Sequence, residues 1–544
     1  MWHLTHPDAA MSTSPTTVTS IPDFQTGSEI VARMPLANPP AAIHDLDRIL
    51  DSLLAAPPDH ETYFRLLEHV RLPVTFVADE LAKRYVNKPV PLGDAEDAWF
   101  RQVVLIWLKT AKAYAHCAER SAPESAPSGS DRFATLLHRC IHFTGMAILE
   151  HHRARREVPW GLWLDLHGYY GTAEDMHLAT LAVPDILEAH ACNTHCAAAY
   201  LAFVLCDMAG SYSLALRDQM LVRRWSAAWS ALVGLHPVAA GETLPPFVID
   251  LMQDVALRPV AECLHTDQIR RLDTSRLAFQ IAHVRHQLRQ RVPPSQLALG
   301  NDCTPQQCAR MLDHLARQWS QARAARKFRR HATSGIIQIC TGFEEMHYFI
   351  SGQEFQQPEN VRIYSRSDFE SLFSFRFQEN PQQALQIRQE KIAAAYSVDT
   401  WEVVNQSANG FRLMRSVSGR KMVHGQLLAL RPHDSERFLL AQATWLMQER
   451  KGGLIAGLRA LPGLPLAVCV RPVDLAGAPN EPYRRAFLMP SLAPADAEPS
   501  LVLPTGWFRP GRVVEVFTDC VWRARLKHVL DLGPDFERVG FEPC

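Results

Sequence analysis

The chain has 544 residues, a formal net charge of -1, 47% hydrophobic residues and 21% charged residues. This length is too great for one hydrophobic core and predicts roughly two to four domains. The near-zero charge excludes a global electrostatic attraction to nucleic acid or anionic lipid, so any basic site has to be local.

The 12 cysteines are scattered along the chain without a C-x-x-C pair. In a chain of this size that pattern predicts reduced thiols rather than a disulfide framework. The first residues lack a basic segment followed by an apolar one, and the longest apolar runs are too short to span a bilayer. A cytoplasmic protein is expected.

The first half of the chain has a helical period. Residues 1–38 are rich in Ser, Thr and Pro and are expected to form a disordered tail. Residues 39–320 are expected to form an all-α domain, because apolar residues recur at three- and four-residue steps. The expected helices lie near residues 41–56, 63–70, 96–118, 133–152, 197–229, 268–289 and 305–329.

One stretch of this region has the spacing of a helical repeat. Trp163, Leu166, Tyr170 and Ala179 are spaced as in a tetratricopeptide repeat. No clear second copy follows, which favours an ordinary helix with core aromatic residues. A helical scaffold that offers a surface to a protein partner is expected in either case.

The segment Cys192-x-x-His195-Cys196 contains side chains of the types that bind zinc. No second pair of ligands follows at a suitable spacing, and cysteine is among the most commonly buried residues. A core role is therefore favoured over a metal site, and no bound zinc is expected.

The second half of the chain has short apolar runs between turn residues. Strands are expected at 336–340, 401–404, 427–430, 438–446 and 454–461. Such spacing predicts a small β-barrel over residues 321–470, with 343–398 inserted between its first two strands. Residues 471–544 are expected to form a second small β domain, with strands at 486–489, 513–517 and 521–529. The fold class is α+β with several domains.

Two polar motifs lie beside the first two of these strands. Arg326-x-x-x-Arg330 precedes one, and Asn405-x-Ser407-x-x-Gly410 ends the other. Arginine carries a planar fork of donors that pairs with phosphate or with guanine O6 and N7. Amide and hydroxyl groups donate to or accept from a base edge, and glycine suits a positive φ or a close backbone approach.

Together the motifs resemble the ligand-binding signature of PilZ domains, the bacterial receptor modules for cyclic di-GMP. The resemblance covers roughly residues 322–462 and not the helical region. It implies that cyclic di-GMP is the ligand and that no other cofactor is needed. The binding residues that it implies are Arg326, Arg330, Asn405, Ser407 and Gly410, with Lys327 and Arg329 in support.

The sequence departs from that family pattern in two places. Asn405 stands where aspartate is commoner, and the insertion 343–398 lengthens the gap between the motifs. Each motif also has a plainer interpretation, as a basic helix C-terminus and as a turn that ends a strand. The alternative function is therefore a PilZ-like scaffold that binds no nucleotide.

Other functional classes have little support in the sequence. It contains no G-x-S-x-G, P-loop, H-E-x-x-H or dinucleotide-binding fingerprint, so an enzyme is not expected. The expected partners are cyclic di-GMP and a protein bound through the helical domain, without nucleic acid or membrane insertion.

Overall fold

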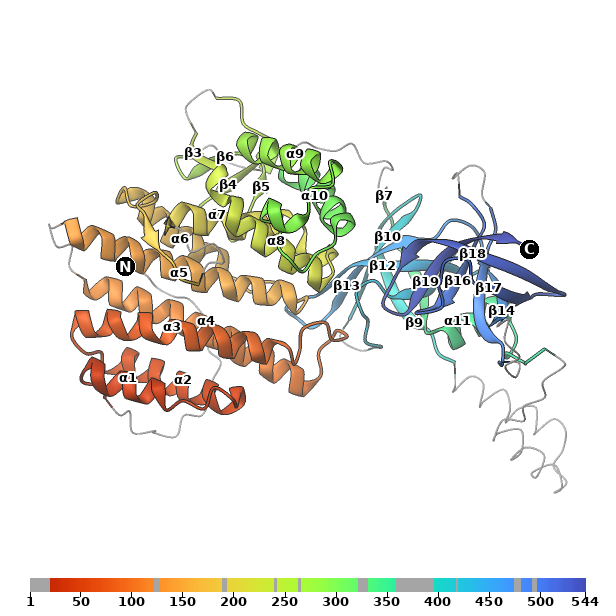
Figure 1. Cartoon of the computed structure of the whole chain (residues 1–544), viewed down its shortest axis with the longest axis horizontal. Coiled ribbons are helices and arrows are strands. Elements are labelled where there is room, and N and C mark those ends of the chain that lie inside the picture. The colour runs from red at the N-terminus through yellow and green to blue at the C-terminus, as the bar shows by residue number, and fades with distance from the viewer. Residues whose placement is uncertain are drawn as a thin grey trace, which may run out of the picture. The chain divides into compact units, whose positions relative to one another are not determined.

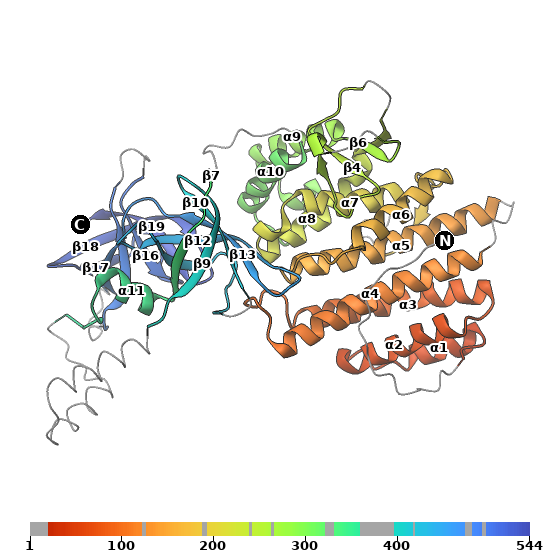
Figure 2. The same cartoon turned by 180° about the vertical axis from the view of Figure 1, so that it is seen from behind.

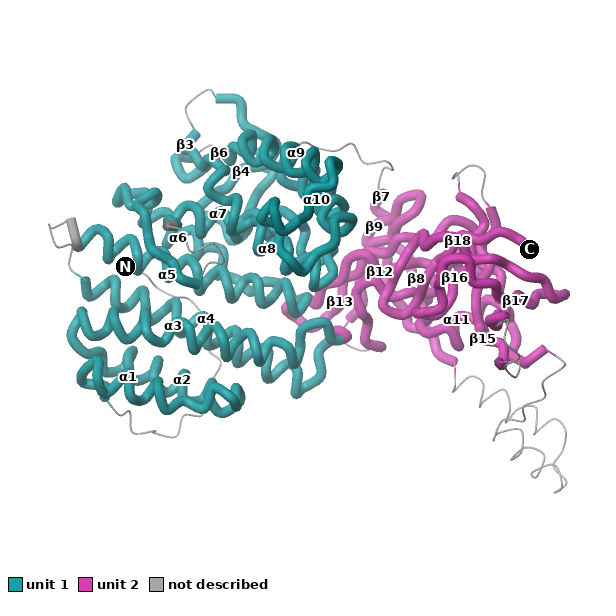
Figure 3. Tube along the Cα trace, in the orientation of Figure 1, with its two compact units in different colours: residues 1–88, 92–325 teal, residues 89–91, 326–544 magenta. Residues whose placement is uncertain are grey.

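The computed structural model describes residues 20–121, 127–187, 193–238, 242–262, 266–320, 331–358, 396–416, 419–473, 481–491 and 497–544. The chain divides into two compact units (Figures 1 and 3). The first contains Met1–Lys88 and Leu92–Ala325, and the second contains Pro89–Pro91 and Arg326–Cys544. No helix in the described ranges is long and apolar enough to cross a membrane.

The first unit is built from helices, as predicted. They are α1 (Phe24–Ala32), α2 (Pro39–Ala55), α3 (His60–Ala82), α4 (Asp94–Arg120), α5 (Pro127–Arg153), α6 (Leu162–Asp175), α7 (Cys196–Met208), α8 (Leu216–Trp229), α9 (Ser275–Arg289) and α10 (Pro305–Trp319). Figures 1 and 2 both show α3, α4 and α5 side by side. Trp107 and Tyr114 of α4 stack on Phe143 of α5 at centroid distances of 5.8 and 5.7 Å.

Helix α1 corrects the prediction of a disordered tail over 1–38. The Asp23 side chain accepts a hydrogen bond from the Thr26 backbone N–H at 2.8 Å and so caps the helix. Val31 is buried on the inner side of α1. The Ser- and Thr-rich composition of the first residues obscured a short helix that has only one cap and one buried edge.

The helical unit also holds short strands that its sequence did not predict. These are β1 (Val183–Pro184), β2 (Asn193–Thr194), β3 (Gly234–Pro237), β4 (Phe247–Asp250), β5 (Arg258–Pro259) and β6 (Ile269–Asp273). The last four form a sheet in the order β3-β6-β4-β5. The helix expected over 268–289 therefore begins with a strand. Strands this short show too little alternation to be recognised in sequence.

The structure shows where the repeat-like spacing around Trp163 and the possible zinc ligands around His195 lie in this unit. Trp163, Leu166 and Tyr170 are buried core residues of α6, while Ala179 lies outside any helix. His195 is the N-cap of α7, with its Nδ1 accepting from the Ala198 backbone N–H at 3.0 Å. Cys192 lies outside the described residues, within which no group of three potential metal ligands is found. The absence of zinc stays a prediction.

The second unit begins with an antiparallel barrel. Its strands are β7 (His331–Ala332), β8 (Ile336–Thr341), β9 (Asp399–Ser407), β10 (Gly410–Arg415), β11 (Leu427–Pro432), β12 (Leu439–Gln448) and β13 (Leu454–Ala460). The sheet order is β10-β13-β12-β11-β8-β9-β7, and pairing of β9 with β10 closes it. Val90 joins this unit through an isolated bridge to Met422, with both N···O distances 2.8 Å.

A second, closed barrel follows directly, as the sequence suggested. Its strands are β14 (Leu466–Pro472), β15 (Arg484–Met489), β16 (Ser500–Pro504), β17 (Val513–Phe517), β18 (Val521–Leu532) and β19 (Phe536–Pro543), in the order β14-β15-β16-β19-β18-β17. Helix α11 (Phe343–Ser351) opens the predicted insertion, and its Met346 shares a core with Leu440 and Phe487 of the two barrels. The helical piece expected at 381–395 lies outside the described residues.

Candidate functional site

The β9–β10 hairpin brings three of the predicted binding residues together. Ser407 pairs with Gly410 across the two strands, and Asn405 pairs with Arg412. The Ser407 hydroxyl donates to the Gly410 carbonyl at 3.4 Å. Asn405, Ser407 and Gly410 are all half-buried, so part of each residue remains accessible to solvent.

A β-bulge decides which face of the barrel this motif occupies. Val403 pairs with Leu413 and Asn405 with Arg412, which leaves Val404 as an extra residue in β9. Val403 and Leu413 are buried inside the barrel, whereas Val404 is exposed. Because one extra residue shifts the alternation of side chains, Asn405 and Ser407 lie on the outer face rather than inside.

Gly410 lies at a close backbone approach that a larger residue would crowd. A Cβ placed there would lie 3.3 Å from the Leu458 carbonyl oxygen of β13. Its φ is not among the positive values found along the described backbone. Of the two roles expected for this glycine, the structure therefore shows close packing of β10 on β13.

The arginine motif leads directly into this hairpin. Arg326, Lys327, Arg329 and Arg330 lie outside the described residues. The next residue, His331, pairs with Gln406, and Ala332 pairs with Asn405. The backbone that continues from Arg330 is therefore joined by strand pairing to the segment that carries Asn405 and Ser407.

A row of side chains extends the outer face across four strands. Asn405 of β9, Arg412 of β10, Gly457 of β13 and Trp445 of β12 are successive partners in register. The Arg412 Cζ lies 5.6 Å from the Trp445 ring centroid. Gly457 leaves the space between them open, since a Cβ there would come within 3.1 Å of the Trp445 Cβ.

Arg412 and Trp445 were missed by sequence reasoning. They are far apart in the chain and become neighbours only through the strand register. The Arg412 Nε is buried and has no hydrogen-bond partner in the described part of the chain. A guanidinium over an indole offers both charge and a flat surface, a combination that suits stacking of a nucleobase.

In the neighbouring row of the same face, the positive charge of the arginine is neutralised by an acidic partner. It runs from Ser407 and Gly410 to Arg459 and Gln442. Arg459 donates to the Gln442 Oε1 at 2.9 Å and to the Asp531 Oδ1 of β18 at 2.6 Å. Burial alone would raise the pKa of Asp531, but its hydrogen bonds and charge interactions with Arg459 and Arg538 hold that pKa below its ordinary value. Arg459 therefore has a structural partner.

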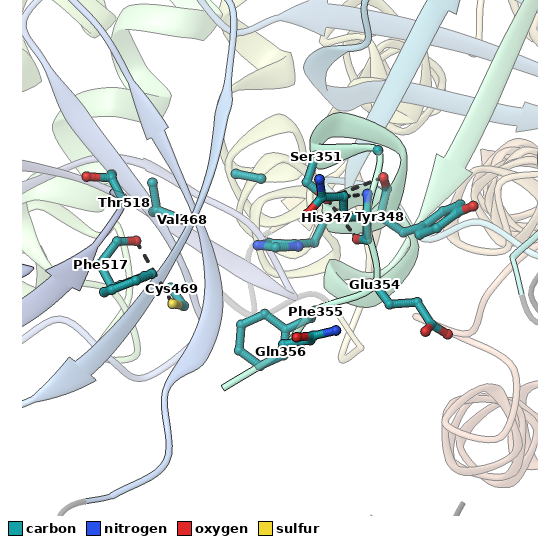
Figure 4. A pocket seen from close by; sticks show the side chains of 13 residues that line it. His347, Tyr348, Ser351, Glu354, Phe355, Gln356, Val468, Cys469, Phe517 and Thr518 are labelled. Atoms are coloured by element: carbon teal, nitrogen blue, oxygen red, sulfur yellow. Dashed lines mark hydrogen bonds between the residues drawn. The ribbon is translucent and has the colours of Figure 1, made fainter. Parts of the chain in front are cut away.

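A separate cavity of about 600 Å³ lies between α11 and strands β14 and β17 (Figure 4). Figure 4 shows His347 pointing from α11 toward Val468. Burial, aided by the charge of Arg485, lowers the pKa of His347 to about 4. None of the motif residues lines this cavity, so we treat it as distinct from the hairpin face.

Comparison with known proteins matches three family models in chain order. "Cyclic-di-GMP receptor FimW, N-terminal domain" matches residues 26–240, and "Cyclic-di-GMP receptor FimW, middle PilZ domain" matches 247–372. "FimW C-terminal beta-barrel domain" matches 468–544. The middle match contains Arg326 and Arg330 but ends before Asn405. The inclusion of Asn405, Ser407 and Gly410 in the candidate site is therefore supported by the hairpin geometry and not by this match.

One curated relative is similar over most of the chain. The "Cyclic-di-GMP receptor FimW" of Pseudomonas aeruginosa is 22% identical over 500 residues, which cover 84% of this chain and 80% of the relative. No solved structure matches the chain. All three domain models match in chain order, and the middle one is a PilZ domain, so the chain is similar to FimW in its domain organisation.

Proposed function

We propose that this protein is a receptor for cyclic di-GMP and binds it on the outer face of the first barrel, at the β9–β10 hairpin. One observation carries the proposal: Asn405, Ser407 and Gly410 share an outward-facing hairpin, and strand β7, paired to it, directly continues the Arg326–Arg330 segment. The name of the similar receptor supports the same ligand.

Different residues of the proposed site would recognise different chemical groups of cyclic di-GMP. Arg326 and Arg330 meet the two phosphates and the guanine acceptors, because a guanidinium pairs bidentately with both groups. Lys327 and Arg329 add positive charge. Asn405 and Ser407 have short side chains that reach one base edge.

Arg412 and Trp445 extend this site beyond the two motifs. The stacked pair offers a base a cationic, aromatic platform beside Asn405. Stacking of this kind tolerates any base, so the platform contributes affinity while the motif residues select guanine. None of these groups has to act on a covalent bond, and the proposed role is binding without catalysis.

Isothermal titration calorimetry of the full-length chain with cyclic di-GMP tests the proposal. We expect saturable heat with a dissociation constant in the micromolar range or below, and much weaker binding of GMP and of the linear guanine dinucleotide. Absence of heat at high micromolar ligand would contradict it. That result would favour the alternative of a PilZ-like scaffold for protein contacts.

The second part of the proposal is that binding is transmitted to a protein partner through the helical unit. Residues 89–91 support this route, because they belong to the barrel unit, where Val90 pairs with Met422, while the chain on either side of them belongs to the helical unit. Amide hydrogen exchange measured with and without ligand should change in helices α3 and α4, which flank these residues. A change confined to the barrels would contradict transmission.

A further inference from the structure

Two cysteines of the helical unit are in direct contact. The Cys308 Sγ donates to the Cys303 Sγ at a distance of 3.0 Å, and both are free thiols. Cys308 is fully buried, whereas Cys303 is only half-buried. Within the described ranges, no other cysteine donates to a second sulfur; Cys140, Cys196 and Cys469 each donate to a backbone carbonyl.

The start of helix α10 explains this contact. Thr304 is the N-cap, and its Oγ1 accepts from the Gln307 backbone N–H at 3.2 Å. Pro305 occupies the first helical position, where its missing N–H costs nothing. Cys303 precedes the cap and Cys308 lies in the first turn, at the two positions whose side chains pack together as a hydrophobic staple. The local fold therefore sets the sulfur contact.

The loop before α10 is fixed independently of the thiols. Arg224 of α8 binds the Asp302 carboxylate with both terminal nitrogens, at 2.5 and 3.0 Å. Trp225 of α8 donates through its Nε1 to the Leu299 carbonyl at 3.0 Å. Because these contacts already order the chain around both thiols, a covalent link needs only a small local movement, to a sulfur–sulfur distance of about 2.05 Å.

We propose that Cys303 and Cys308 form a redox-active dithiol that closes to a disulfide by exchange with low-molecular-weight disulfides such as oxidised glutathione. The Cys303 thiolate attacks one sulfur of the oxidant, forms a mixed disulfide and releases one thiol. The Cys308 thiolate then attacks the Cys303 sulfur and releases the second thiol. The protein loses two electrons and two protons, and the oxidant becomes two thiols.

The solvent exposure of the two cysteines indicates which thiolate attacks first. Only Cys303 is open to an oxidant in solution, since Cys308 has no exposed surface. Burial, followed by the hydrogen bond to Cys303, raises the pKa of Cys308 to about 12. Cys308 is therefore a poor first nucleophile and suits the second step, in which the target sulfur is already in contact with it.

Mass spectrometry can read this chemistry from one peptide. Trypsin cleaves after Arg291 and Arg310, so the peptide 292–310 contains both cysteines and no other. Full-length protein is equilibrated in glutathione buffers of increasing oxidation, alkylated and digested. We expect this peptide to escape alkylation and to be lighter by two hydrogens. The internal disulfide should exceed the mixed one by about tenfold or more, because closure is intramolecular.

Single variants and an unpaired thiol serve as matched controls. In Cys308→Ser the reaction should stop at a glutathione adduct on Cys303, and in Cys303→Ser the buried Cys308 should stay a thiol. Exposed Cys520, which donates to no second sulfur in the described structure, should form only a mixed disulfide. A wild-type peptide that stays fully alkylated in the most oxidising buffer, or that accumulates only glutathione adducts, would overturn the proposal.

Discussion

The buried ion cluster of the helical unit and the outer face of the first barrel both present arginines, but with different partners. In the cluster, Arg71 contacts the Asp185 carboxylate at 2.5 Å. Arg139 contacts Asp185 at 3.1 Å and Glu68 at 3.0 Å. On the barrel face, Arg412 lies over the Trp445 ring and forms no ion pair within the described structure.

This difference separates structural arginines from a candidate binding arginine. A buried charge has to be paired or it destabilises the fold, and the helical cluster has an acid for each arginine. Arg412 is half-buried, so water can compensate its charge until a ligand replaces that water. Arg459, on the same face but bound to Asp531, resembles the cluster more than it resembles Arg412.

The largest expected effect comes from breaking the helical cluster. Asp185→Asn leaves two buried arginines with one acid fewer, and we expect it to lower the free energy of unfolding by about 3–5 kcal/mol. Chemical denaturation followed by circular dichroism measures this loss. Asp45→Asn, which removes a surface pair with Arg48, is the control and should cost about 1 kcal/mol or less. Equal costs would refute the structural role.

Acid should destabilise the same cluster. Burial alone would raise the pKa values of Asp185 and Glu68, but their arginine partners hold both below the ordinary range. A carboxyl with a lowered folded-state pKa stabilises the fold above its unfolded pKa and loses that contribution as the pH falls. We expect a loss of about 2–3 kcal/mol between pH 5 and strongly acidic solution, and a smaller loss in Asp185→Asn. An equal loss in that variant would exclude Asp185 as the source.

Removal of the motif arginines should affect affinity rather than stability. Arg326→Ala or Arg330→Ala removes a charge-assisted contact worth about 1.5–3 kcal/mol, equivalent to roughly a tenfold to hundredfold loss of affinity for cyclic di-GMP. Arg326→Lys should also bind more weakly, because a point charge cannot replace a bidentate fork. Calorimetric titration measures each constant. A double alanine variant with wild-type affinity would locate the site elsewhere.

The two rows of the barrel face allow a matched comparison. Arg412→Gln should weaken cyclic di-GMP binding by about 0.5–2 kcal/mol, since it removes the cation above Trp445. Arg459→Gln changes the same residue type on the same face, but that arginine is held by Asp531, so its effect on affinity should be close to zero. Titrations of both variants decide the matter, and equal losses would rule out the stacking platform.

Among the motif residues, a smaller effect than that of the arginines is expected at Ser407. Ser407→Ala removes one hydroxyl that already bonds within its own hairpin, so the expected cost in binding is about 1 kcal/mol. A loss much greater than tenfold in the same titration would show that the hairpin, rather than the arginines, provides most of the affinity.

The sequence predicted most strands of the first barrel, but it did not predict which side chains become neighbours on the outer face of that barrel. Strands β8, β9 and β11 to β13 are apolar runs between turns, but β10 begins with the mixed segment Gly410-Phe411-Arg412 and was missed. The bulge at Val404 was also missed, because strand register sets it. Arg412 and Trp445 meet only across Gly457, a relation that no local pattern reveals. Asn405 and Ser407 could be placed near each other from the sequence because their spacing is local, and their role in binding stays a prediction.

Amide hydrogen exchange with and without saturating cyclic di-GMP shows where the ligand binds as well as whether it binds. We expect slower exchange in the β9–β10 hairpin, residues 399–415, and in the segment that leads into it from Arg326 to Ala332. We expect no change around His347 and Cys469. Ligand-dependent protection at that cavity, with the hairpin unaffected, would show that cyclic di-GMP binds there and not at the hairpin.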